Sequence, residues 1–184
     1  APPFTTSTLQ QEAARKLLFS FSKTMTVAQR LYESGFFTYM RTDSVNLSAE
    51  ALNTAKNAIV QLFGESYSQT RNFATKSKGA QEAHEAIRPT DMSRPTIAAE
   101  PDQNKLYELI WKRTLASQMA DAQLERTTVK IAADKHDEQF VATGEMIQFD
   151  GFLKVYLESS DDEDEEQEGM LPNLKKGELL ADRY

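Results

Sequence analysis

The pattern of apolar and polar positions predicts that residues 1–125 are mainly helical. One helix is expected to begin at Ser7, which matches a capping box with Gln10, because apolar residues then recur on one helical face. That face consists of Leu9, Ala13 and Leu17. A second helix is expected over residues 25–34, with Gly35 as its left-handed stop. Its inward face consists of Ala28, Leu31 and Tyr32.

An extended segment and a third helix are expected next. The stretch "FFTYM", residues 36–40, is apolar and follows a helix stop, so it predicts a short extended piece. Ser48 has the position of an N-cap for a helix over residues 49–63, and Gly64 is expected to end that helix. Residues 65–80 are polar and predict a loop.

Two more helices are expected before the character of the chain changes. The stretch "AQEAHEAIRP", residues 80–89, predicts a short helix that ends at Pro89, because proline disfavours the helical conformation in the residue before it. Pro101 is expected to open a long helix that reaches about Ala122. The apolar positions of this long helix are Leu106, Ile110, Trp111, Leu115 and Met119.

The last part of the chain, residues 126–184, is expected to form β-structure. β-forming residues alternate or cluster at residues 126–133, 139–146 and 152–158. A sheet of this size has a thin core, so we expect it to be the C-terminal part of a larger β-rich domain whose other strands lie outside this chain. The predicted fold class is therefore α+β: a mainly helical domain with a helix-turn-helix-like core over residues 1–125, then a β-rich partial domain.

The acidic composition comes from one segment. The chain of 184 residues has a net charge of −7, and residues 158–168 contain eight acidic residues and no basic ones. The remainder has a net charge of +1 and can present a local basic surface to phosphate. Overall acidity is therefore no argument against nucleic acid as a partner. The acidic segment itself is expected to be a solvated loop.

Composition also excludes several classes of protein. The absence of cysteine excludes disulfides, thiolate metal sites and a cysteine nucleophile. No apolar run is long enough to predict a membrane span, and no signal segment opens the chain, so a cytoplasmic location is expected. The first residue is not methionine, which suits a fragment of a longer protein.

The segment "GFFTYMRTDS", residues 35–44, contains the clearest candidate chemistry. Side chains alternate along an extended segment, so Phe37, Tyr39 and Arg41 are expected on one side. A phenol with an ordinary pKa of about 10 is a poor nucleophile at neutral pH, but a neighbouring cation favours its phenolate. Arginine also binds phosphate through two parallel hydrogen bonds. The pair suits attack on a phosphodiester, and the alternative is an ordinary half-buried strand tyrosine.

Two further pairs are candidate contacts to nucleic acid. His84 and Arg88 are four residues apart in the helix predicted over residues 80–89, so they are expected on one face, where both can grip a phosphate. Gln29 and Glu33 have the same spacing in the helix that leads into the tyrosine segment. For the first pair the alternative is a solvated histidine with an arginine that caps the helix, and for the second pair it is a plain solvent face.

These stretches together resemble one family, the type IA DNA topoisomerases. The resemblance rests on "PFTTSTLQQEAARKL", on "AQRLYESGFFTYMRTDS" followed by "NLS", and on "AHEAIRPTD", which appear in the order expected for the active-site tyrosine domain of that family. The resemblance covers about residues 3–125. Within the family, a methionine at the position of Met40 resembles the bacterial topoisomerase I branch. The β-rich remainder over residues 126–184 then resembles part of the arch, or gate, domain.

The resemblance implies a role for each matching residue. Tyr39 matches the nucleophile, which attacks a single-strand phosphodiester, keeps the 5′ phosphate and releases the 3′ hydroxyl. Arg41 matches the residue that contacts the scissile phosphate and stabilises the charge that develops there. His84 matches a contact to the DNA backbone, and Gln29 and Glu33 match positions that face the bound strand. The family relaxes negatively supercoiled DNA and rejoins the strand without ATP.

The resemblance also implies a cofactor and partners. The family requires Mg²⁺ bound by an acidic domain and a lysine that acts as general acid, and both are expected outside this chain. No metal ligands are predicted within the chain, because the acidic run over residues 158–168 lacks the spacing of a magnesium site. The isolated chain is therefore expected to be inactive. Expected partners are single-stranded or negatively supercoiled DNA in the nucleoid and the remaining domains of the same enzyme.

Two other classes of function remain open on the sequence alone. One is a non-catalytic DNA-binding module of the helix-turn-helix type, with Tyr39 in the core and Arg41 as a phosphate contact. The other is an interaction domain whose acidic segment mimics nucleic acid. Deleting residues 158–168 separates the second alternative from a passive loop.

Overall fold

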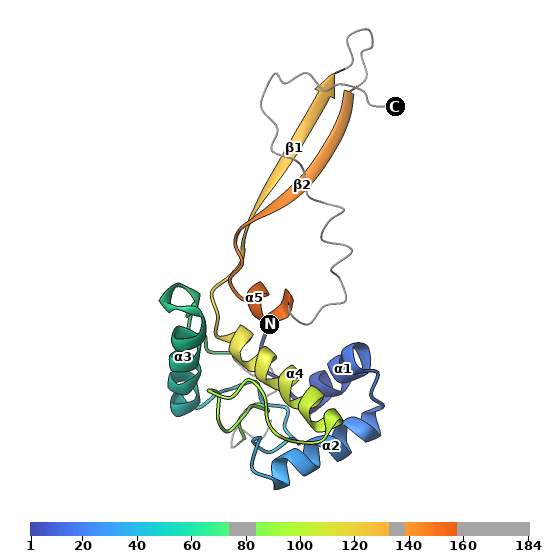
Figure 1. Ribbon diagram of the computed structural model, residues 1–184, viewed down its shortest axis with the longest axis vertical. Coiled ribbons are helices and arrows are strands. Elements are labelled where there is room, and N and C mark those ends of the chain that lie inside the picture. Colours follow the sequence, from blue (N-terminus) through green and yellow to red (C-terminus); the bar gives the residue numbers. More distant parts are fainter. Residues whose placement is uncertain (74–83, 133–138, 158–184) are drawn as a thin grey trace.

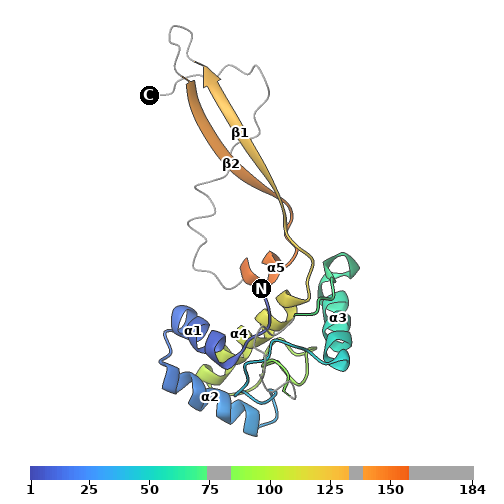
Figure 2. The ribbon, with the colours of Figure 1, turned by 180° about the vertical axis from the view of Figure 1, so that it is seen from behind.

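The computed structural model describes residues 1–73, 84–132 and 139–157. Within these ranges a body of helices supports a two-stranded antiparallel hairpin that projects away from it in both views (Figures 1 and 2). This arrangement confirms the predicted α+β class. The acidic segment over residues 158–168 lies outside the described residues.

Helix α1 (Thr6–Leu17) begins earlier than predicted, because its N-cap lies two residues before Ser7. Thr5, rather than Ser7, is the N-cap: its side chain accepts from the backbone N–H of Thr8, and the Thr8 hydroxyl lies 2.9 Å from the backbone N of Thr5. The predicted apolar face is correct, since the residues buried from this helix are Leu9 and Ala13.

Helix α2 (Phe21–Glu33) begins four residues before the predicted start. The Ser20 side chain accepts from the backbone N–H of Lys23, so a local cap sets the start, and this cap was not recognised in the sequence. Gly35 has a φ of 78°, which confirms its predicted role as the left-handed stop. The expectation that Tyr32 faces inward is wrong, because its side chain is 39% exposed.

Helix α3 (Ala49–Phe63) has the predicted bounds. The Ser48 side chain accepts from the backbone N–H of Ala51, and Gly64 follows the last residue of the helix with a φ of 104°. A short 3₁₀ turn, η1 (Glu65–Tyr67), comes next. Local signals at both ends were sufficient here, because a cap and a glycine stop act within one turn.

Helix α4 (Pro101–Ser117) lies at the centre of the body and packs against α1, α2 and α3. It opens at Pro101 as predicted but ends several residues before Ala122. The chain leaves the helix because Met119 forms an isolated bridge with Ser68 beside η1. The buried residues along α4 and just after it include all five of the predicted apolar positions: Leu106, Ile110, Trp111, Leu115 and Met119.

The hairpin consists of β1 (Gln123–Ala132) and β2 (Gln139–Phe149), with Thr128 opposite Thr143 in the antiparallel register. Both strands are longer than predicted, and several of their apolar side chains are exposed. These exposed residues are Leu124, Phe140, Val141, Met146 and Ile147.

The third predicted strand is wrong in its described part. Residues after β2 turn at Gly151, which has a φ of 50°, and form the short helix α5 (Leu153–Leu157). This helix packs against α4 and buries Val155. Contact with the helical body therefore overrides the β-propensity of this stretch.

No helix among residues 1–73, 84–132 and 139–157 is long and apolar enough to cross a membrane.

Candidate active site

The tyrosine segment begins where Gly35 ends α2. The backbone N–H of Gly35 donates to the carbonyl of Tyr32, and that of Phe36 donates to the carbonyl of Leu31, which closes the helix end. Phe37 is then buried and its ring stacks on that of Tyr107 with centroids 5.3 Å apart and planes at 7°. The segment therefore leaves the helix from a fixed apolar anchor.

Burial alternates along the residues that follow Phe37. Tyr39, Arg41 and Asp43 are exposed, whereas the residues between and after them are buried, namely Met40, Thr42 and Ser44. Tyr39 and Arg41 therefore share the exposed side of an extended segment, as predicted. The expectation that Phe37 lies on the same side is wrong, because Phe37 is in the core.

Thr6, at the first turn of α1, fixes the exposed segment to the body. Its hydroxyl donates to the carbonyl of Met40 at 2.8 Å and accepts from the backbone N–H of Thr42 at 2.9 Å. The backbone N–H of Thr6 also donates to the carbonyl of Thr42 at 2.8 Å. Because both neighbours of Arg41 are held by one side chain, the backbone at Arg41 has a defined position.

The ring of Tyr39 contacts two other aromatic rings. Its centroid lies 5.5 Å from that of Tyr32, in an edge-on arrangement, and 5.6 Å from that of His84. Tyr39 is 38% exposed, and no hydrogen-bond partner for its hydroxyl exists among the described residues. Tyr39 is therefore partly exposed while its ring is supported from two sides.

Arg41 is exposed and makes no ion pair with any residue in the described part of the chain. Its guanidinium can therefore offer its donors to an anion without first breaking a contact there.

Two other tyrosines, Tyr107 and Tyr67, are less suitable as nucleophiles. Tyr107 is buried, burial raises its pKa to about 12, and its hydroxyl donates to the carbonyl of Arg94 at 2.8 Å. The Tyr67 hydroxyl donates to Asp150 at 2.7 Å. Both oxygens are occupied by structural hydrogen bonds, in contrast to that of Tyr39.

Residues 84–89 are extended, so the predicted helix over residues 80–89 is wrong in its described part. Ile87 forms a bridge with Phe4, and Pro89 forms a bridge with Phe37. The backbone N–H groups of this segment donate to residues distant in the chain, such as that of Ala86 to the carbonyl of Asn46 at 2.8 Å. These long-range partners replace the hydrogen bonds that a helix would make.

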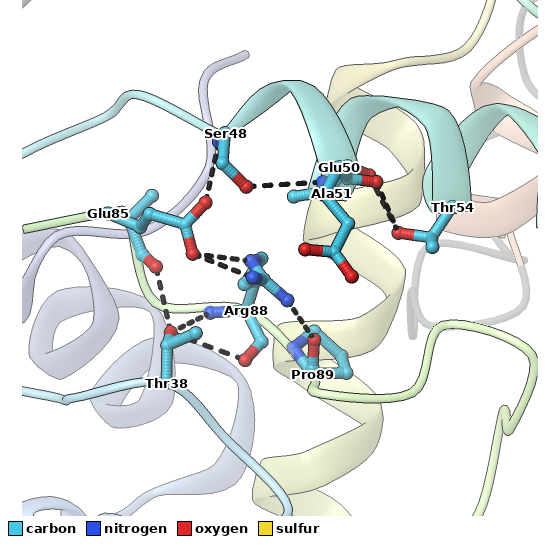
Figure 3. A network of polar contacts seen from close by, with 9 residues as sticks. Thr38, Ser48, Glu50, Ala51, Thr54, Glu85, Arg88 and Pro89 are labelled. Carbon is cyan, nitrogen blue, oxygen red and sulfur yellow. Dashed lines mark hydrogen bonds and ion pairs between the residues drawn. The ribbon is translucent and has the colours of Figure 1, made fainter.

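The pair predicted on one helix face is separated by this change. His84 reaches Tyr39, whereas the side chain of Arg88 is only 16% exposed and bonds within the protein. Its Nε and Nη2 donate to Glu85 Oε2 at 3.0 and 2.7 Å, and its Nη1 donates to the carbonyl of Pro89 at 3.1 Å. Figure 3 shows this network.

The carboxylate of Glu85 also bonds to the start of α3. Its Oε1 accepts from the backbone N–H of Ser48 at 2.6 Å. Burial raises the pKa of Glu85, but the hydrogen bonds from Ser48 and Arg88 outweigh burial and hold it below its usual value. Glu85 is therefore stabilised as a carboxylate.

Gln29 and Glu33 lie near the end of α2, as predicted, and contact each other. Gln29 Nε2 donates to Glu33 Oε1 at 2.7 Å on the exposed surface. The same helix end carries Tyr32, whose ring contacts Tyr39. The pair therefore belongs to the helix that supports the tyrosine segment.

Sequence reasoning missed Tyr32 and Thr38 as parts of this site. Tyr32 was expected in the core, although its position just before the Gly35 stop was a usable signal. The Thr38 hydroxyl donates to the carbonyl of Ala86 at 2.9 Å and accepts from the backbone N–H of Arg88 at 3.0 Å. No local pattern signals these bonds, because their partners are distant in sequence.

The described residues contain no group of three or more histidine, aspartate or glutamate side chains that can hold a metal ion. The side chains around Tyr39 are aromatic or basic, which does not suit Mg²⁺. The described side chains around Tyr39 therefore do not form a Mg²⁺ site.

An exposed tyrosine whose ring contacts a histidine, two residues before an exposed arginine, is suited to nucleophilic attack on a phosphoester. In a comparison with known sequences, the sequence model described as DNA topoisomerase matches residues 1–183. The chain belongs to the DNA topoisomerase family, which confirms the resemblance inferred from its motifs.

Individual relatives give the same result. The chain is 52% identical to the DNA topoisomerase 1 of Synechocystis over 97% of its own length, and 52% identical to that of Zymomonas mobilis over its whole length. The structure of full-length topoisomerase I from Thermotoga maritima superposes with a TM-score of 0.70 at 45% identity, over 84% of this chain. The matches cover 20%, 16% and 26% of those three proteins, so the chain spans a small part of each.

Proposed function

We propose that this chain is the strand-cleaving part of a type IA DNA topoisomerase and that Tyr39 is its nucleophile. The observation that carries the proposal is the position of Tyr39: it is exposed, two residues before the exposed Arg41, and its ring is held against Tyr32 and His84. Tyr67 and Tyr107 have hydroxyls engaged in structural hydrogen bonds, and Tyr32, which is as exposed as Tyr39, packs the edge of its ring against Tyr39.

The proposed reaction exchanges one phosphoester bond for another. The Tyr39 oxygen loses its proton and bonds to the phosphorus of a single DNA strand, while the bond from phosphorus to the 3′ oxygen breaks and that oxygen takes up a proton. The 5′ phosphate stays on Tyr39 until the 3′ hydroxyl attacks it and restores the strand. Because the covalent linkage keeps the ester bond, rejoining needs no ATP, and supercoil strain drives relaxation of negatively supercoiled DNA.

Charge and shape assign roles to the neighbouring residues. The Arg41 guanidinium binds the scissile phosphate and stabilises the charge that develops on it. His84 contacts the backbone of the strand near the break, since it lies beside Tyr39. Gln29 and Glu33 line the approach of the strand along the end of α2.

The reaction also requires a metal ion and a general acid, and the chain spans only a small part of its longer relatives. We propose that Mg²⁺ and a lysine general acid belong to the segments that those relatives possess beyond the match and that DNA in the nucleoid is the substrate. We also propose that residues 126–184 are part of an arch domain whose other strands lie in those segments. The exposed apolar residues of the hairpin support this proposal, because further strands would cover them. The helical domain over residues 1–125 then presents Tyr39 to the rest of the enzyme.

The decisive experiment traps the covalent intermediate on a single-stranded oligonucleotide, using a full-length topoisomerase that contains these residues. Tyr39→Phe should abolish the adduct, since it removes the attacking oxygen and keeps the ring. Tyr32→Phe is the matched control, because it removes a neighbouring phenol and should leave the adduct. Peptide mapping that places the DNA on another tyrosine, or an adduct that survives Tyr39→Phe, would refute the assignment.

A further inference from the structure

Arg88 was a candidate phosphate contact, but its guanidinium is directed into the protein. The three nitrogen atoms of the group all have partners there: two donate to Glu85 Oε2 and the third donates to the carbonyl of Pro89 (Figure 3). A phosphate would have to displace a two-pronged bond to a carboxylate in order to bind this side chain.

Glu85 joins Arg88 to a second element. While Oε2 accepts from Arg88, Oε1 accepts from the backbone N–H of Ser48, the N-cap residue of α3. The Ser48 hydroxyl in turn accepts from the backbone N–H of Ala51 at 3.2 Å. A negative charge is also favourable at this end of a helix. The carboxylate thus ties the start of α3 to the extended segment over residues 84–89.

The backbone of Arg88 bonds to the residue that precedes the nucleophile. Thr38 donates its backbone N–H to the carbonyl of Arg88 at 3.0 Å, and its hydroxyl accepts from the backbone N–H of Arg88, also at 3.0 Å. In the sequence, Thr38 is adjacent to Tyr39, and Glu85 is adjacent to His84. The network therefore holds the backbone directly next to Tyr39, at Thr38, and directly next to His84, at Glu85.

We infer that Glu85 and Arg88 are positioning residues, which together with Ser48 and Thr38 hold Tyr39 and His84 in their mutual arrangement. Arg88 acts through Glu85 and Thr38 and does not contact DNA. As far as it concerns DNA cleavage, this inference rests on the function proposed above, and it extends that function to a pair outside the reacting groups.

The chemistry of the pair explains why a neutral substitution should disturb the site. Glu85→Gln keeps an acceptor for Ser48 but removes the negative charge, which leaves the guanidinium of Arg88 mostly shielded from solvent without its counter-charge. Arg88→Gln leaves the carboxylate of Glu85 without its counter-charge. Both changes should free the segment over residues 84–89 to shift relative to Thr38.

The first test needs only the 184-residue chain. Nuclear Overhauser contacts between the rings of Tyr39 and His84 should weaken or vanish in Glu85→Gln and in Arg88→Gln, while dispersed spectra show that the fold persists. Glu12→Gln is the matched control, because Glu12 and Arg15 form an ion pair of the same sequence spacing on α1. Unchanged ring contacts in both substituted chains would overturn the inference, whether or not the chain cleaves DNA.

The second test measures covalent adduct formation and noncovalent binding in the full-length enzyme. Glu85→Gln and Arg88→Gln should each slow adduct formation by about tenfold or more, since a displacement of about 1 Å can cost up to about 100-fold. The dissociation constant for a single-stranded oligonucleotide and its salt dependence should not change. The double substitution should be no slower than either single one, because both break the same unit.

A direct phosphate contact predicts a different result. In that case Arg88→Gln should weaken binding and reduce the slope of log K against log salt by about 0.7, while Glu85→Gln does neither, and this outcome would overturn the inference. Tyr39→Phe in the same assay separates the two proposals. An adduct that persists in Tyr39→Phe refutes the proposed nucleophile, whereas loss of the adduct there, with normal rates in both Glu85→Gln and Arg88→Gln, refutes only the positioning role.

Discussion

The rings of Tyr39 and His84 lie 5.6 Å apart, although the two residues belong to segments separated by the whole of α3. Bridges between Phe37 and Pro89 and hydrogen bonds between Thr38 and Arg88 bring the segments together. The arrangement places an imidazole beside an accessible phenol, and this relationship can be tested by substitution.

Replacing His84 should impair cleavage without unfolding the protein. In the full-length enzyme, His84→Ala should lower the rate of adduct formation by about tenfold or more, because a hydrogen bond to a charged group contributes about 1.5–3 kcal/mol. His84 is half-buried at the edge of the body, so thermal unfolding of the 184-residue chain should change little. An unchanged cleavage rate would contradict the assigned phosphate contact.

Arg41→Lys should separate charge from geometry. Lysine keeps the positive charge but loses the planar fork that binds two phosphate oxygens, so adduct formation should fall by about tenfold or more. Arg41 is exposed and has no ion pair with the described residues, so urea unfolding should be unaffected within about 0.5 kcal/mol. Cleavage at the normal rate would show that positive charge alone suffices at this position.

The 184-residue chain by itself should not relax supercoiled DNA in the presence of Mg²⁺. Its described residues lack a metal site, and its binding to single strands should be weak and should fall with salt, because it depends on a few phosphate contacts. Gel relaxation and fluorescence anisotropy at two salt concentrations measure both properties. Relaxation by the chain alone would contradict the proposal that further segments complete the site.

The pH dependence of the free energy of unfolding should show the stabilising contribution of the Glu85 carboxylate. Its pKa is lowered in the folded chain, because hydrogen bonds from Ser48 and Arg88 outweigh the effect of burial. Its stabilising contribution should therefore be present above its unfolded pKa and should be lost as the pH falls through the folded value. Urea midpoints of the original chain and of Glu85→Gln should differ at pH 7 and converge in acid. A difference that does not depend on pH would contradict this assignment.

Tyr67 should stabilise the junction between the hairpin and the body. Its hydroxyl donates to Asp150 at the end of β2, and its ring lies 4.8 Å from that of Phe149. Tyr67→Phe should lower the free energy of unfolding by about 1 kcal/mol, since it removes one partly buried hydrogen bond. Tyr32→Phe is the control and should have little effect, because Tyr32 is exposed. An equal decrease in the free energy of unfolding in the two variants would show that the hydrogen bond to Asp150 does not stabilise the junction.

Some features could be predicted because they depend on a few neighbouring residues. Helix α3 has its predicted bounds because Ser48 and Gly64 act within one turn of its ends. The same reasoning placed the start of α1 slightly wrong, because Thr5 and Ser7 both suit a cap and local sequence does not choose between them. Serine and threonine are both preferred N-cap residues, so N-cap propensity alone does not locate the start of the helix.

Other features depend on contacts that are distant in the chain. The stretch over residues 84–89 has helical composition but is extended, because Phe4, Phe37 and Thr38 pair with it. The stretch that forms α5 has β-forming residues but is helical, because Val155 packs into the body. In both cases tertiary hydrogen bonds and burial outweigh local preference.

The sequence by itself determined the chemical groups of this site: the tyrosine and arginine on one side of an extended segment, the histidine, and the family to which their motifs point. The tertiary structure alone decided how these groups are used. It placed His84 against Tyr39 and turned Arg88 away to Glu85, although the sequence suggested that the two act together. The physical reason is that an arginine binds whichever anion the fold brings within reach, and only the fold brings Glu85 and Ser48 to the same place.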